Sequence, residues 1–163
     1  MTSTRPPFAA LFVICAGLLA IALYLQEQVG LEPCPMCILQ RYAFTAIGLV
    51  ALAGAIQGPR GRGLKAYGAL LIVLALAGAG VAARQSYIQH FPPKVSSCGT
   101  DLDFLVNTFP ISQALPKIFA GSGDCSEVKW RLLGLSVAEW ALVWFILIVI
   151  GSAWLAFRRR AAR

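Results

Sequence analysis

The 163-residue chain is poor in charge, because only 13% of its residues are Asp, Glu, Lys or Arg, about half of the roughly 25% found in soluble domains. Hydrophobic residues make up 58% of it and its mean hydropathy is +0.72, which excludes an intrinsically disordered protein. The net charge of +7 does not indicate a nucleic-acid partner, because the basic residues border long apolar runs instead of alternating with polar and aromatic ones. A membrane protein is therefore the starting hypothesis.

The sequence is also poor in metal-ligand patterns. It has one histidine, His90, and one Cys-x-x-Cys motif, formed by Cys34 and Cys37. A structural zinc site needs two further ligands at a compatible spacing, and the remaining cysteines are widely separated. A Cys-x-x-Cys-His haem attachment site is excluded because Ile38 follows Cys37. We expect no metal.

Four uncharged stretches divide the chain, with 21, 18, 18 and 18 residues between flanking charges. Each is long enough for a helix that crosses about 30 Å of hydrocarbon. Helices of a soluble bundle would show a polar face, and the segments 8–25 and 140–157 show none. We predict an all-α polytopic membrane protein, a four-transmembrane-helix bundle in one domain (1–163), with spans at about 8–25, 40–58, 66–84 and 138–157.

The basic residues are distributed unevenly between the two sides of these spans. One side would hold eight basic residues and no acidic ones, and the other six basic residues and all seven acidic ones. Because Lys and Arg concentrate in cytoplasmic loops, both termini and loop 58–65 are predicted to be cytoplasmic. The extracytoplasmic loops would be about 26–37 and 86–136. The first apolar stretch exceeds the roughly 7–15 residues of a signal-peptide core, so we expect it to remain as a membrane anchor.

Within the longer extracytoplasmic loop, the segment 102–119 mixes large apolar side chains with Asp, Asn, Ser, Gln and Lys. Pro110 and Pro116 would divide it into short helical pieces. It is apolar enough to lie on a bilayer surface and too polar to cross one. We expect interfacial helical segments here, with a small folded cap on the helices as the alternative.

Four of the five cysteines lie outside the spans, all on the extracytoplasmic side: Cys34, Cys37, Cys98 and Cys125. Cys15 lies within the first span, where cysteine is usually a small packing residue. Disulfides persist in an oxidising compartment, so two static bridges are one interpretation, and it is strongest for the two loop cysteines. The Cys-x-x-Cys pair instead favours thiol–disulfide exchange, because its small ring is strained and such pairs carry a reactive thiolate.

The residues around Cys37 add a chemical argument. Pro35 suits the first turn of a helix, which would place Cys37 near the helix N-terminus, where the macrodipole favours a thiolate. Arg41 follows four residues later on the same helix face, and its guanidinium can also donate hydrogen bonds to a carbonyl-bearing ligand. The alternative for Arg41, and for Arg84 at the same interface of the third span, is a side chain that extends to the lipid headgroups.

Three features stand out when these patterns are combined: Cys-Pro-Met-Cys-Ile-Leu-Gln-Arg at 34–41, the lone Cys98, and Gly-Ser-Gly-Asp-Cys-Ser-Glu-Val-Lys-Trp at 121–130 followed by Leu-Gly-Leu-Ser at 133–136. With four short spans, they resemble the DsbB family of bacterial disulfide-bond formation proteins. The resemblance covers roughly residues 8–157. It implies a multi-pass protein of the bacterial inner membrane, whose long loop is periplasmic.

The resemblance also implies an enzyme, a quinone-dependent protein-disulfide oxidoreductase. Cys98 and Cys125 match the loop pair that takes electrons from a periplasmic DsbA-like thiol oxidase, through a mixed disulfide at Cys98. Cys34 and Cys37 match the membrane-proximal pair that reoxidises the loop pair. Cys37 would face a bound quinone as a thiolate and Arg41 would polarise a quinone carbonyl. Electrons would then leave in the membrane quinone pool, as ubiquinol or menaquinol.

One position departs from the family pattern. Relatives often carry a histidine directly after the arginine of the third span, near the quinone. Here Gln85 follows Arg84, and His90 lies five residues further on. We expect Gln85 to act as a neutral hydrogen-bond donor in a quinone site with Cys37, Arg41 and Arg84, and His90 to be an ordinary interfacial side chain.

Three other hypotheses remain at this point. The protein could be a paralogue dedicated to one substrate protein, or a non-catalytic membrane scaffold with two structural disulfides. A vitamin K epoxide reductase-like enzyme also combines four helices with Cys-x-x-Cys, but there the catalytic pair lies on the last span, whereas here it begins the second. Four cysteines allow three pairings.

Overall fold

The computed structural model describes residues 4–30, 33–91, 128 and 130–158. This part of the chain forms four long helices, α1 (Arg5–Val29), α2 (Pro35–Gln57), α3 (Arg62–His90) and α7 (Val137–Arg158). A short hairpin of β1 (Arg131–Leu132) and β2 (Leu135–Ser136) precedes α7. All four helices are long and apolar enough to cross a membrane. The all-α polytopic fold class is thus confirmed.

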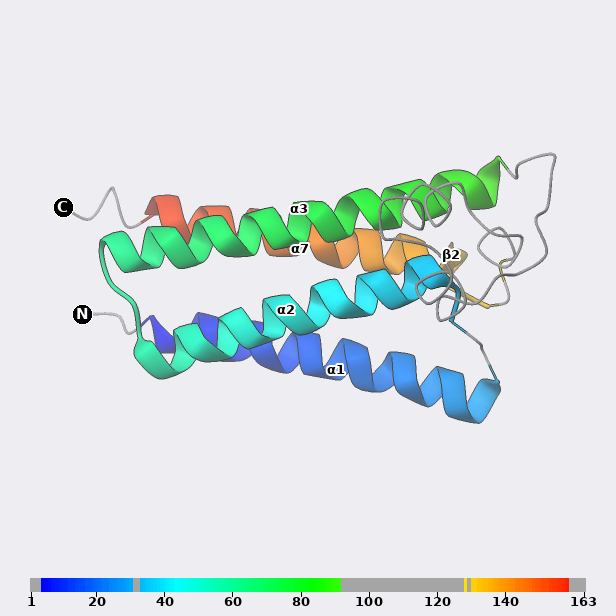
Figure 1. The fold of residues 1–163 in the computed structure, drawn as a ribbon, viewed down its shortest axis with the longest axis horizontal. Helices are drawn as coiled ribbons and strands as arrows, with labels where there is room; N and C mark the ends of the chain where they lie inside the picture. The colour runs from blue at the N-terminus through cyan, green and yellow to red at the C-terminus, as the bar shows by residue number, and fades with distance from the viewer. Residues whose placement is uncertain (1–3, 31–32, 92–127, 129, 159–163) are drawn as a thin grey trace, which may run out of the picture.

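The helices run up and down as two packed pairs. α1 lies against α2, α3 lies against α7, and contacts between α2 and α3 join the pairs into one bundle (Figure 1). The start of α1, the α2–α3 connection and the end of α7 share one end of the bundle (Figure 1). The start of α2 and the β-hairpin lie at the opposite end, so the Cys-x-x-Cys motif is located there.

The helices extend beyond the apolar stretches that predict them. α2 begins at Pro35, before the expected start near residue 40, and α3 continues to His90, past the expected end near residue 84. The backbone hydrogen bonds of a helix do not depend on whether its side chains are apolar, so a helix can continue past the end of an apolar stretch. Hydropathy therefore marks a shorter segment than the helix itself. At its other end α2 is closed by Gly58, whose left-handed φ of 58° suits glycine.

Small residues allow the helices to approach closely. Phe145 of α7 is fully buried and stacks on Phe44 of α2, with ring centroids 4.2 Å apart. The ring of Phe145 also covers Gly78 of α3, where an added Cβ would lie 2.5 Å from Cζ. At Gly54 of α2, an added Cβ would lie 2.7 Å from the ring of Phe8. These glycines therefore provide space for the aromatic core, as small residues do in membrane bundles.

The β-hairpin is a feature that the sequence patterns do not predict. Its turn consists of Leu133 and Gly134, with φ of 54° and 84°, and such left-handed pairs are typical of two-residue hairpin turns. Ser136 then caps α7: its Oγ accepts from the Glu139 N–H at 3.3 Å, and Glu139 Oε2 accepts from the Ser136 N–H at 2.6 Å. This reciprocal arrangement is a capping box.

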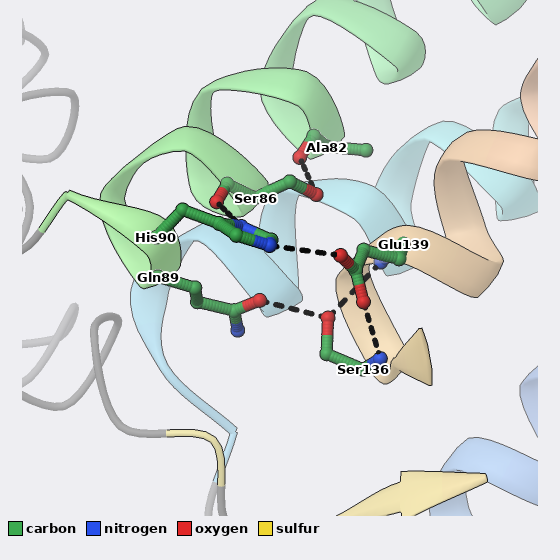
Figure 2. A network of polar contacts seen from close by, with 6 residues as sticks. All are labelled: Ala82, Ser86, Gln89, His90, Ser136 and Glu139. Atoms are coloured by element: carbon green, nitrogen blue, oxygen red, sulfur yellow. Dashed lines mark hydrogen bonds and ion pairs between the residues drawn. The ribbon is translucent and has the colours of Figure 1, made fainter. Parts of the chain in front are cut away.

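The capping box also connects the hairpin to the end of α3 (Figure 2). The Ser136 hydroxyl donates to Gln89 Oε1 at 2.7 Å, and the second carboxylate oxygen of Glu139 lies 3.7 Å from His90 Nε2. His90 is largely exposed at this edge. The contacts hold the beginning of α7 beside the end of α3.

Some predictions fall outside the described residues. They are the interfacial segments within 102–119 and the loop cysteines Cys98 and Cys125. These remain predictions. Cys15 lies in the core of the bundle and is 1% exposed, which agrees with its expected packing role.

Candidate active site

The Cys-x-x-Cys pair lies at the N-terminus of α2. Cys34 is the N-cap residue and is buried, while Cys37 is half-buried in the first turn behind Pro35. The Cys37 N–H donates to Cys34 Sγ at 3.4 Å, and the two sulfurs lie 3.0 Å apart. The backbone amides and the dipole of a helix N-terminus favour negative charge at this point. The local sequence therefore places two thiols together where a thiolate is stabilised.

Two buried glutamines complete the surroundings of the sulfurs. Gln85 of α3 is 3% exposed, and its Nε2 donates to Cys34 Sγ at 3.3 Å and to Cys37 Sγ at 3.1 Å. Its Oε1 accepts from Gln40 Nε2 at 2.7 Å. Gln85 was expected as a neutral donor. Gln40 was missed, and its only signal in the sequence is its position three residues after Cys37, on the same face of a helix.

Arg41 connects α2 to the end of α1. Its Nη1 donates to Gln26 Oε1 at 2.5 Å and its Nη2 to the carbonyl oxygen of Ala22 at 3.1 Å. These bonds fix the guanidinium one turn beyond Cys37, on the side of the bundle that faces α1. The planar fork of arginine suits such simultaneous contacts.

A pocket of about 390 Å³ opens beside these groups, within the range typical of small-molecule sites. All four helices and the hairpin contribute to it. Most of the wall is apolar and includes three tryptophans, Trp130, Trp140 and Trp144. The polar residues in the lining include Cys34, Cys37, Gln40, Arg41, Gln85 and Gln89. The arrangement can hold a flat apolar ligand against a thiol and several hydrogen-bond donors.

The structure thus brings Cys34, Cys37, Arg41 and Gln85 together around one pocket. Arg84 is not among the lining residues, and its guanidinium carbon lies 5.6 Å from the centre of the Tyr87 ring on the same helix. Within the described ranges, no group of three His, Cys, Asp or Glu side chains could hold a metal ion.

A Cys-x-x-Cys pair at a helix N-terminus, lining an apolar pocket of a four-helix membrane bundle, defines a membrane thiol–disulfide oxidoreductase. Comparisons with known proteins agree. The family "Disulfide bond formation protein DsbB" matches residues 4–155. The chain therefore belongs to the DsbB family.

Individual relatives match over nearly their whole length. Disulfide bond formation protein B of Aromatoleum aromaticum is 54% identical, with 97% of this chain and 95% of that protein covered. The protein of the same name from Azoarcus sp. is 51% identical, with 96% and 94% covered. That of Marinobacter nauticus is 45% identical, with 100% and 97% covered.

Family membership defines the class of enzyme. Members are quinone-linked protein-disulfide oxidoreductases that oxidise DsbA. This chain is accordingly a multi-pass membrane protein-disulfide oxidoreductase. The matches do not favour a dedicated paralogue or a non-catalytic scaffold.

Proposed function

We propose that this enzyme reoxidises a periplasmic DsbA-like dithiol protein and passes the electrons to a membrane quinone, through Cys98 and Cys125 and then through Cys34 and Cys37. The observation that carries the proposal is the apolar pocket that Cys37, Arg41 and Gln85 line together. It provides a place where a lipid-soluble acceptor can meet a thiol.

The electron balance is simple. Two thiols of the partner protein become one disulfide and release two electrons and two protons. In each exchange step a thiolate attacks a disulfide sulfur. The two electrons therefore pass from one cysteine pair to the next, and their number is conserved. A quinone, ubiquinone or menaquinone, supplies the final acceptor, because it takes up two electrons and two protons as it becomes a quinol.

The residues present fit such a ligand. Tryptophan rings and aliphatic side chains suit a flat ring with an apolar tail, and Arg41 can donate from its guanidinium to a carbonyl oxygen. Cys37 lies at the positive end of α2, where its thiolate form is favoured. Because Arg84 lies outside the lining of the pocket, we assign the quinone site to Cys37, Arg41 and Gln85.

We also propose that the enzyme lies in the bacterial inner membrane with both termini in the cytoplasm. Basic residues border the bundle end at which α1 begins and α2 connects to α3: Arg5, Arg60, Arg62 and Lys65. The positive-inside rule assigns such an end to the cytoplasm. The Cys-x-x-Cys motif, at the opposite end, would then face the periplasm.

Quinone reduction by the purified protein tests this function. Reduced DsbA-like protein and a soluble quinone are added, and quinol formation is followed. We expect Cys37→Ser to abolish quinol formation. Cys15→Ala, which removes a thiol from the core of the bundle, should leave the rate of quinol formation unchanged. Quinol formation at the original rate by Cys37→Ser would refute the proposal.

A further inference from the structure

Two buried side-chain amides form a chain that ends at the reactive sulfurs. Gln40 donates to Gln85, and Gln85 donates to both Cys34 Sγ and Cys37 Sγ. We propose that Gln40 is a positioning residue for thiol–disulfide exchange, because it fixes the orientation of the Gln85 amide so that the NH₂ group faces the sulfurs. This inference rests on the proposed function of the cysteine pair.

The orientation of Gln85 matters because the two ends of an amide are chemically opposite. The NH₂ end donates two hydrogen bonds and the oxygen end only accepts. A thiolate accepts hydrogen bonds, so an amide oxygen turned toward it would repel its charge. Gln40 directs its own NH₂ group at Gln85 Oε1, which keeps that oxygen 2.7 Å from Gln40 Nε2 and away from the sulfurs.

The contacts of Gln85 also match the course of the reaction. When a disulfide is attacked at one sulfur, the other sulfur leaves as a thiolate. The Gln85 Nε2 lies 3.3 Å from Cys34 Sγ and 3.1 Å from Cys37 Sγ, so it can stabilise negative charge on either one. From one position, Gln85 can thus donate a hydrogen bond to whichever of the two sulfurs carries the negative charge.

Burial makes Gln40 necessary for this arrangement. Gln40 is 5% exposed and Gln85 is 3% exposed, so water has little access to replace a lost hydrogen bond. A buried acceptor that loses its hydrogen-bond donor destabilises the protein by the full free energy of its desolvation. Without the Gln40 amide, the Gln85 oxygen is expected to turn toward another donor and the NH₂ group to leave the sulfurs.

A double-mutant cycle tests the proposal. Gln40→Met, Gln85→Met and the double variant are prepared as reduced protein, and the iodoacetamide reaction of Cys34 and Cys37 is measured by mass spectrometry at pH 7. Loss of a hydrogen bond to a charged sulfur lowers the thiolate population about tenfold. The greater nucleophilicity of a more basic thiolate offsets part of this loss, so the alkylation rate should fall about threefold. We expect this loss in Gln40→Met and in Gln85→Met, with no further loss in the double variant, because Gln40 acts through Gln85.

The controls come from the same chain. Ser86→Ala changes the neighbour of Gln85 in the sequence. The Ser86 hydroxyl donates to the carbonyl oxygen of Ala82 at 3.0 Å, so the cysteines of this variant should be alkylated at the original rate. Cys15 is 1% exposed and reports folding, because it stays unmodified in a folded variant. The proposal would be overturned if folded Gln40→Met were alkylated at the wild-type rate. It would also be overturned if the rate in the double variant fell by the product of the two single reductions.

A second measurement needs no substitution. In the wild-type protein, the NMR signals of the Gln85 side-chain NH₂ group should shift when the Cys34–Cys37 pair is reduced, and unchanged signals would overturn the proposal. Neither experiment requires quinone or a partner protein. A protein that passes them and fails to reduce quinone would refute the proposed function alone.

Discussion

Arg41 offers the sharpest test of the proposed quinone site. The substitution Arg41→Met removes the guanidinium and keeps an apolar stem of similar length. The structure uses two of the five N–H donors of the guanidinium to fix it to α1, through Gln26 and Ala22. Among the described residues, the other donors of this guanidinium can serve a carbonyl oxygen in the pocket that Arg41 lines.

The size of the effect follows from the type of hydrogen bond. A bond that involves a charged group contributes about 1.5–3 kcal/mol, which corresponds to a roughly 10- to 150-fold lower kcat/KM for quinone. Arg41→Lys keeps the charge but loses the planar fork, so it cannot contact both α1 acceptors and the ligand. Its kcat/KM should fall between those of the wild type and Arg41→Met.

The assay varies the quinone concentration at a fixed, saturating concentration of reduced partner. Arg62→Met is the matched control, because it removes the same charge at the start of α3, at the far end of the bundle. Its kcat/KM should equal that of the wild type. An unchanged kcat/KM in Arg41→Met, or an equal loss in Arg62→Met, would refute the assignment of Arg41 to the quinone site.

Two further predictions concern the scaffold that holds the site. Gly78→Ala places a methyl group 2.5 Å from Phe145 Cζ, and this overpacking should lower the free energy of unfolding by about 1–3 kcal/mol. The apparent Tm in detergent should therefore fall. It should not fall in the control Gly80→Ala, where the added Cβ meets nothing within 4 Å. Equal Tm values for the two variants would contradict the packing. Ser136→Ala removes the cap of α7 and should cost about 1 kcal/mol, seen as faster hydrogen exchange in the first turn of α7, and unchanged exchange would argue against the capping box.

The bundle and the Cys-x-x-Cys environment could be predicted from sequence because both depend on local patterns. Long apolar stretches predict spans through their length alone. Pro35 marks the start of a helix, which places Cys37 in its first turn, and a spacing of four places Arg41 on the same face. All of these features follow from residues close together in the sequence and do not depend on how one helix is rotated against another.

The contact between Gln40 and Gln85 depends on that rotation and could not be predicted. The two residues are 45 positions apart, and spans that are apolar on all sides do not indicate which face meets a neighbour. The same reason applies to Arg84, which the sequence places in the predicted quinone site and which does not line this pocket. Adjacent residues point about 100° apart around a helix, so Gln85 faces the cysteines and Arg84 does not line their pocket.

The hairpin before α7 was missed because its strands have only two residues each, too few for an alternating pattern to register. Leu133 and Gly134 form the turn. The Ser-x-x-Glu spacing of Ser136 and Glu139 is a helix-start signal that sequence inspection could have used.

The central claim is that electrons pass from a partner dithiol through the Cys34–Cys37 pair to quinone. Its most direct test counts the partner disulfides and the quinol molecules formed by the purified enzyme under anaerobic conditions. The account predicts one quinol for each partner disulfide. Partner oxidation without an equal amount of quinol would contradict it.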